Sequence, residues 1–118
     1  MLVRDGAIAA RLDSVGRSGF ATSRHPRTAA GISRDASRLF LVTVDGRQAP
    51  YSDGMTLEEL ATLMRALGSH EAVNLDGGGS TAMVVADSDT SYRVVNRPSD
   101  RGGERAVGNA AAFVRRCQ

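Results

Sequence analysis

Residues that could carry out chemistry gather in the stretch from Asn74 to Thr81, which reads Asn-Leu-Asp-Gly-Gly-Gly-Ser-Thr. It joins two apolar runs, 72–75 and 82–86, that are too short for helices and rich in strand-forming residues. Consecutive glycines suit a turn that needs positive φ or close approach to the main chain, and the bare N–H groups of such a turn can bind an anion beside Asp76. The candidate anion ligands are the glycine N–H groups and two hydroxyls: Gly77, Gly78, Gly79, Ser80 and Thr81.

Three familiar motifs do not account for these glycines. A P-loop needs a Lys after its last glycine, and the chain contains no Lys. A dinucleotide fingerprint would lead into a helix, whereas residues 83–85 are Met-Val-Val and favour a strand. A nucleophile elbow needs a glycine two residues after the serine, but Ser80 is followed by Thr81 and Ala82. The structural alternative is a hairpin turn in which Asp76 hydrogen-bonds to its own backbone.

Composition excludes several classes of protein. The 118 residues suffice for one domain with a modest core, and no apolar run approaches the ~20 residues that span a bilayer. All 15 basic residues are Arg, yet the net charge is only +2, and no basic run carries interleaved aromatics, so no nucleic-acid partner is expected. Cys117 is the only cysteine, which excludes an internal disulfide. Neither a metal, a cofactor nor a secretory signal is expected.

The elements that must position this stretch are several strands and one helix. Thr56 and Glu59 have the spacing of a capping box, apolar residues then recur at helical spacing, and Gly68 suits the C-cap, which predicts a helix at about 57–67. Residues 39–44 are almost continuously apolar, which predicts a central strand buried on both faces.

Shorter strands are expected on either side of that helix. The predicted strands lie before and after a turn at Asp5-Gly6, begin after Pro26, flank the glycine stretch, and cover 91–96 and 110–114. Residues 11–24 are predicted to form a loop. The pattern predicts an α+β fold, with a mostly antiparallel sheet packed on one main helix.

Polar turns recur where the predicted strands end, at 24–28, 45–47, 74–81 and 96–105. If these ends meet at one edge of the sheet, carboxylates, arginines and the glycine turn converge there. Arg and backbone N–H groups can hold an anion, and paired carboxylates can supply acid and base. The sequence therefore predicts a site for an anionic sugar or a phosphate at that edge.

Five ordered segments carry a resemblance to a known family, within a match that extends over about Leu2 to Val114: 24–29 (Arg-His-Pro-Arg-Thr-Ala), 41–47 (Leu-Val-Thr-Val-Asp-Gly-Arg), 54–61, 74–83 and 96–109. In these segments the chain resembles the phosphodiester glycosidase family, which has bacterial members labelled as exopolysaccharide biosynthesis proteins. The resemblance implies hydrolysis of a sugar-1-phosphodiester on a bacterial glycan or glycolipid, between the anomeric carbon and the phosphate oxygen.

The resemblance also points to site residues. Asp76 and Glu104 are the expected acid, base or nucleophile, with Asp45 in reserve, and Arg27 and Arg105 are the expected clamps for phosphate or carboxylate. The other substrate-binding candidates are small or polar residues of the same turns: Thr28, Gly77, Gly78, Gly79, Ser80, Thr81, Asn96 and Asp100. The alternatives are a surface ion pair between Glu104 and Arg105 and a turn-capping role for Asp45.

Domains of this family begin upstream with a strand and an Asn-Gly-x-Phe-like turn that no segment here matches. The chain, one domain over 1–118, is therefore expected to be the C-terminal part of a larger phosphodiester glycosidase domain. The alternative function is a truncated, non-catalytic remnant that binds a glycan or an anion. Uncovered strands would favour a homo-oligomer or a completing chain as partner. Export or localisation at the cell surface is implied only by the resemblance, because members of this family are commonly exported.

Overall fold

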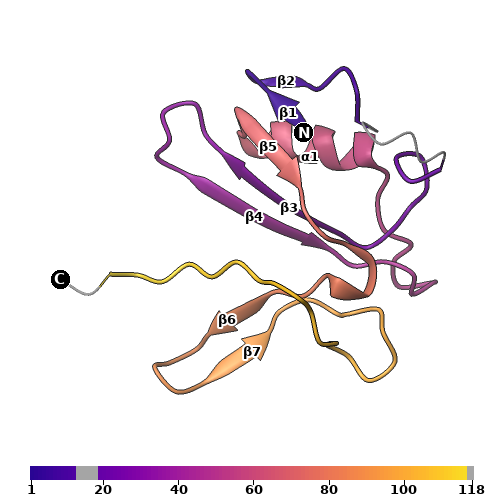
Figure 1. Cartoon of the computed structure of the whole chain (residues 1–118), viewed down its shortest axis with the longest axis vertical. Helices are drawn as coiled ribbons and strands as arrows, with labels where there is room; N and C mark the ends of the chain where they lie inside the picture. Colours follow the sequence, from indigo (N-terminus) through magenta and orange to yellow (C-terminus); the bar gives the residue numbers. More distant parts are fainter. Residues whose placement is uncertain (13–18, 117–118) are drawn as a thin grey trace.

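The computed structural model describes residues 1–12 and 19–116. The middle of the predicted loop at 11–24 and Cys117 lie outside these residues. A five-stranded antiparallel sheet carries helix α1 on one face, and a separate two-stranded hairpin lies beyond it (Figure 1). The elements, in chain order, are β1 (Val3–Arg4), β2 (Ala7–Ile8), β3 (Arg27–Ile32), β4 (Leu39–Val44), α1 (Leu57–Leu67), β5 (Glu71–Asn74), the short 3-10 helix η1 (Gly78–Ser80), β6 (Val84–Ala86) and β7 (Tyr92–Val94). The predicted α+β class is confirmed.

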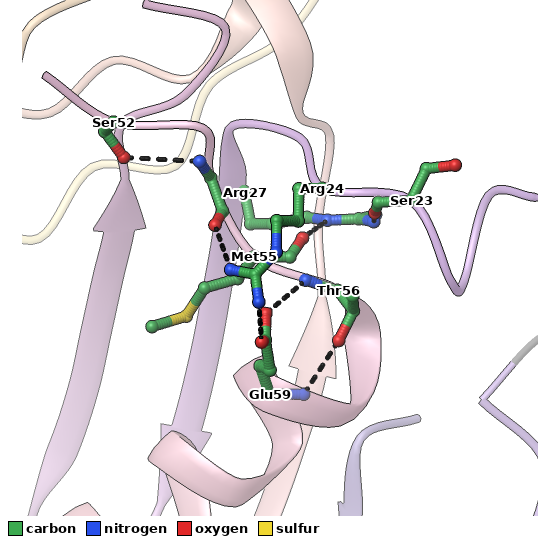
Figure 2. Close-up of polar contacts among 8 residues, drawn as sticks. Ser23, Arg24, Arg27, Ser52, Met55, Thr56 and Glu59 are labelled. Atoms are coloured by element: carbon green, nitrogen blue, oxygen red, sulfur yellow. Dashed lines mark hydrogen bonds and ion pairs between the residues drawn. The ribbon is translucent and has the colours of Figure 1, made fainter. Parts of the chain in front are cut away.

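Helix α1 forms where the sequence predicts it. The Glu59 N–H donates to Thr56 Oγ1 (3.2 Å) and the Thr56 N–H donates to Glu59 Oε2 (2.9 Å), which is the expected capping box (Figure 2). Gly68 ends the helix in the left-handed conformation, with φ of 109°. The buried stripe of the helix is Leu57, Leu60, Ala61 and Met64. It packs on the sheet through Leu2, Val3, Ala29 and Ala72.

The sheet is closely packed under the helix. The main sheet has the order β2-β1-β5-β3-β4, and β3 pairs with both β4 and β5. A Cβ atom on Gly31 of β3 would lie 2.3 Å from Ser69 Oγ and 2.9 Å from Met64 Cε. Only glycine lets the strand approach the helix this closely.

The prediction that 39–44 is a central strand is wrong. Strand β4 lies at the edge of the sheet, and only its face toward α1 is covered. On the opposite face Leu39 and Leu41 are 49% and 40% exposed, next to Ile32 and Val73 at 37% each. The apolar pattern of 39–44 correctly predicts a strand. Its second apolar face, however, is not covered by any of the described residues.

The C-terminal part of the chain departs from the sheet. Strands β6 and β7 pair only with each other among the described residues, so the two strands that flank the glycine stretch belong to different sheets. The strand predicted at 110–114 is wrong, because residues 106–116 are exposed and carry no strand in the described structure. They run as an extended yellow trace in Figure 1. Among the described residues, no helix has the length and apolarity required to cross a membrane.

Candidate functional site

The polar turns do gather at one end of the main sheet. In the antiparallel register Arg27 pairs with Val44 and Ala29 with Asn74, so β3 begins where β4 and β5 end (Figure 1). The Gly78 N–H donates to Pro26 O (3.0 Å), which joins two of the turns. We call the turns at 24–28, 45–47 and 74–81, with the loop at 96–105, the sheet-end site.

Asp45 fastens the 96–105 loop to the end of β4. Its Oδ1 accepts hydrogen bonds from Asn96 Nδ2 (3.1 Å) and the Arg97 N–H (2.9 Å), and its Oδ2 accepts one from the Tyr51 hydroxyl (2.8 Å). The bond to Asp45, followed by its negative charge, raises the pKa of the Tyr51 hydroxyl. These three hydrogen bonds suit the Asp45 carboxylate to hold the 96–105 loop in position.

Asn96 extends this network to the far side of the glycine turn. Its Nδ2 also donates to Thr81 O (2.9 Å), and its Oδ1 accepts from the Met83 N–H (2.8 Å). Thr81 is only 1% exposed, and the Thr28 hydroxyl contacts the Thr81 hydroxyl at 3.4 Å. The C-terminal end of the glycine turn is therefore held in place by the contacts of Asn96 and Thr28 with Thr81.

Four of the expected substrate-binding residues form one cluster where the 96–105 loop contacts the glycine turn. Arg105 Nη2 donates to Ser80 Oγ (2.7 Å), and Arg105 Nη1 lies 3.6 Å from Asp100 Oδ2. The Asp100 carboxylate lies against Gly79, where an added Cβ would be 2.2 Å from Oδ1. Arg105 thus pairs with Asp100, and the alternative ion pair with Glu104 is not formed in the described structure.

The glycine turn is closed by its own hydrogen bonds. The Gly77 N–H donates to Asp76 Oδ1 (2.9 Å), as the structural alternative predicts for Asp76, and the Gly78 N–H is occupied by Pro26 O. Two of the three glycine N–H groups, those of Gly77 and Gly78, are therefore already engaged and do not form an open nest. The Asp76 side chain is exposed. Its Oδ1 accepts the Gly77 N–H, and its Oδ2 accepts no hydrogen bond from the described residues. Its second oxygen is available to a ligand.

Arg27 faces the interior of the fold. It is 1% exposed, Nε donates to Met55 O (2.9 Å), and Nη2 donates to Phe20 O (2.7 Å) and Ser23 O (2.9 Å). Its guanidinium also covers the Phe20 ring at 4.7 Å. Figure 2 shows Arg27 beside Met55 and Ser23, and Arg24 reaching Glu59 in the first turn of α1. These contacts engage the Arg27 guanidinium with backbone carbonyl groups, whereas the expected clamp role would require it to face a ligand.

Glu104, the third candidate carboxylate, lies on the wall of a cavity in the 96–105 loop. This open cavity has a volume of about 410 Å³. The other lining residues are Val94, Asn96, Arg97, Pro98 and Gly103. Glu104 is exposed and forms no ion pair within the part of the chain that the structure describes. Through Asn96 and Arg97, this cavity adjoins the Asp45 network.

The sequence analysis missed Arg47 and His25 as site residues. The exposed Arg47 guanidinium lies over Gly78, where an added Cβ would be 3.1 Å from Nη1, and its Nη2 is 3.3 Å from His25 Nδ1. Because guanidinium only donates, His25 Nδ1 accepts this bond. Both residues belong to polar turns that the analysis singled out, so their location was a usable signal.

Burial, followed by the charges of Arg47 and Arg27, lowers the pKa of the His25 imidazole. Below its unfolded pKa of about 6.5 the unfolded chain binds a proton that the folded chain resists, so folding stability decreases as the pH falls through this window. In His25→Gln we expect a shallower loss of stability between about pH 7 and 5. Urea unfolding at each pH measures it, and parallel curves for the two proteins would contradict this assignment.

One group with metal-ligand geometry lies at the opposite end of β5. Ligand atoms of Asp5, His70 and Glu71 lie within 4.8 Å of one another, with His70 Nε2 3.7 Å from Asp5 Oδ1. Glu71 Oε1 already accepts a hydrogen bond from the Asp5 N–H (2.8 Å). This group does not belong to the sheet-end site.

Comparison with known proteins supplies the context for this geometry. A family model described as phosphodiester glycosidase matches residues 1–114. The SPbeta prophage-derived uncharacterized protein YomE of Bacillus subtilis (strain 168) is 39% identical over 84 residues, covering 71% of this chain and 12% of that protein.

Two solved structures are also similar. A protein of Burkholderia pseudomallei K96243 is 48% identical, with a TM-score of 0.64, over 72% of this chain and 15% of that one. The catalytic domain of zebrafish N-acetylglucosamine-1-phosphodiester alpha-N-acetylglucosaminidase, auto-inhibited by its pro-peptide, is 28% identical with a TM-score of 0.63, over 84% of this chain and 33% of that one. The chain spans a minor part of each relative.

Proposed function

The chain belongs to the phosphodiester glycosidase family, and from this premise we propose that its sheet-end site hydrolyses a sugar-1-phosphodiester. The reaction breaks the bond between the anomeric carbon and a phosphate oxygen, and releases a free sugar and a phosphomonoester. Phosphate is a good leaving group, so the site mainly has to bind its charge and stabilise an oxocarbenium-like centre. The observation that carries the proposal is the convergence of the four polar turns at one end of the sheet.

The proposed chemical groups are the two exposed carboxylates. Asp76 has one oxygen fixed by the Gly77 N–H, and Glu104 lines the neighbouring cavity. We assign acid, base or nucleophile roles to this pair and a positioning role to Asp45. The phosphate-clamp role expected for Arg27 is left out of the proposal, because its guanidinium is buried against carbonyl groups.

The cluster of Ser80, Asp100 and Arg105 is proposed to bind the substrate. Arg105 offers donors to an oxygen of the substrate, and Asp100 sets its orientation at 3.6 Å. Gly79 permits this arrangement, since a side chain there would displace the Asp100 carboxylate. The proposed substrate is a bacterial surface glycan or glycolipid, in line with the export habit of the family.

A non-catalytic glycan- or anion-binding role is the second candidate. One observation favours it: one face of the sheet exposes apolar residues of β3, β4 and β5. A second copy or a completing chain is the proposed partner that would bury that face.

The test is product analysis with a synthetic sugar-1-phosphodiester and the purified 118-residue chain. We expect equal amounts of free sugar and phosphomonoester. Formation of sugar-1-phosphate and free alcohol would indicate a phosphodiesterase instead. Saturable binding of the substrate without any product would support the second candidate.

A further inference from the structure

The arginines of the sheet-end site differ in what balances their charge. Arg27 is buried against three carbonyl oxygens, Arg24 pairs with Glu59, and Arg105 lies beside Asp100. Arg97 lies over the Tyr51 ring at 4.8 Å, next to the Asp45 carboxylate that binds both residues. Arg47 has no carboxylate within ion-pair distance in the described part of the chain, as is also true of the Arg97 and Arg101 guanidinium groups, but of these three only Arg47 lies over the glycine turn. Its positive charge is therefore available to a ligand.

The geometry around Arg47 holds that charge at the glycine turn. Its guanidinium rests on Gly78, which adopts the left-handed backbone conformation with φ of 61°. A Cβ atom at this position would stand 3.1 Å from Nη1 and 3.4 Å from Nη2, so a side chain there would press on the guanidinium. His25 Nδ1 contacts Nη2 of the same group at 3.3 Å. A guanidinium held between two contacts loses less entropy when it binds a ligand.

The contact with His25 leaves most of the hydrogen-bonding capacity of Arg47 unused. The guanidinium has five N–H donors in a fork that matches two oxygens of a phosphate, and His25 takes one of them. Asp76 precedes Gly78 by two residues, so the Arg47 guanidinium lies over the turn that carries this exposed carboxylate. This is the pairing that cleavage beside a phosphate requires.

We propose that Arg47 binds the phosphate group of the substrate and that His25 is the positioning residue for its guanidinium. The inference rests on the proposed function for the identity of the substrate. It assigns the phosphate contact to a residue at the end of β4 instead of Arg27 at the start of β3.

A phosphate bound to Arg47 would change the pKa of the His25 imidazole. The positive charges that face its ring are Arg47 and Arg27, and both lower the pKa of the imidazole. An anion on Arg47 would offset that field, so the pKa of His25 should rise when phosphate binds. A guanidinium with a structural role alone would produce no such coupling.

Inorganic phosphate is the probe that tests the assignment. We would titrate the 118-residue chain by NMR and follow both the affinity and the pKa of the His25 ring. We expect saturable binding that raises this pKa, and an affinity roughly 10- to 100-fold weaker in Arg47→Met. Arg47→Lys should fall between them, because it keeps the charge and loses the fork. Arg38→Met, in the exposed turn between β3 and β4, is the matched control and should bind as the parent does.

Three results would overturn the assignment: no saturable phosphate binding by the parent chain, equal affinity in Arg47→Met, or binding that leaves the pKa of His25 unchanged. None of them depends on turnover. If Arg47 binds phosphate but no sugar is released from the phosphodiester, the proposed function fails and this assignment stands. If sugar is released and Arg47→Met still binds phosphate normally, the reverse holds.

Discussion

Replacement of Asp76 by Asn is expected to lower turnover of a sugar-1-phosphodiester by roughly 10²- to 10⁴-fold, the usual contribution of a positioned acid or base. The substitution is nearly isosteric. The Asn oxygen can still accept the hydrogen bond that the Gly77 N–H now donates to Asp76 Oδ1 at 2.9 Å. The turn should therefore keep its shape while the negative charge and the exchangeable proton are lost. Steady-state release of free sugar measures the effect.

The matched control is Asp89→Asn, an exposed carboxylate in the connection between β6 and β7. It should retain parental turnover. Thermal unfolding of both variants should lie close to that of the parent, because neither side chain is buried. Full turnover in Asp76→Asn would remove Asp76 from the reaction and leave Glu104 as the candidate carboxylate.

Arg27→Met should destabilise the fold by about 3 kcal/mol, because it removes a buried guanidinium and leaves three partly buried carbonyl groups without their donor. Met55 O, Phe20 O and Ser23 O all accept from this guanidinium. The Met side chain has a similar length and can still pack on the Phe20 ring, so lost hydrogen bonding dominates the effect. Urea unfolding at neutral pH measures it.

Two further variants make this result specific. Arg27→Lys keeps a positive charge but cannot reach several carbonyls in the same geometry, so an intermediate loss is expected. Arg38→Met, an exposed arginine beside β4, should change stability by less than about 0.5 kcal/mol. A loss below about 1 kcal/mol in Arg27→Met would show that its contacts contribute little to folding.

Local signals allowed the helix and most strands to be predicted from the sequence. The boundaries of α1 follow from Thr56, Glu59 and Gly68, whose hydrogen bonds lie within a few residues of each other. The turn between β1 and β2 follows similarly from Asp5 and Gly6, which both adopt positive φ. Such features depend little on the rest of the chain, which is why they could be predicted.

The order of the strands could not be predicted in the same way. The apolar pattern of residues 39–44 correctly predicts a strand, but burial on both faces requires partners on both sides. In the described structure β4 has a neighbour on one side only. Residues 110–114 have a strand-like composition and no partner strand. Strand pairing depends on distant residues, and composition does not reveal whether those residues are present.

The candidate site was predictable as a region and not as a set of contacts. Resemblance placed Ser80, Asp100 and Arg105 together, and the structure brings them into one cluster. Sequence alone did not distinguish Arg27 from Arg47. The Arg27 guanidinium points into the fold toward backbone carbonyls, whereas the Arg47 guanidinium lies over the glycine turn. Tertiary packing decides in which direction a side chain at the end of a strand points, and the sequence pattern does not show it.

We propose that this chain cleaves the bond between the anomeric carbon and the phosphate oxygen. Hydrolysis of a synthetic sugar-1-phosphodiester in ¹⁸O-labelled water tests it most directly, because sugar and phosphomonoester would also form if the phosphorus–oxygen bond broke. Attack at the anomeric carbon leaves the phosphomonoester unlabelled, and this is the result that we predict. Mass spectrometry that finds one ¹⁸O atom in the phosphomonoester would show attack at phosphorus and would contradict the account.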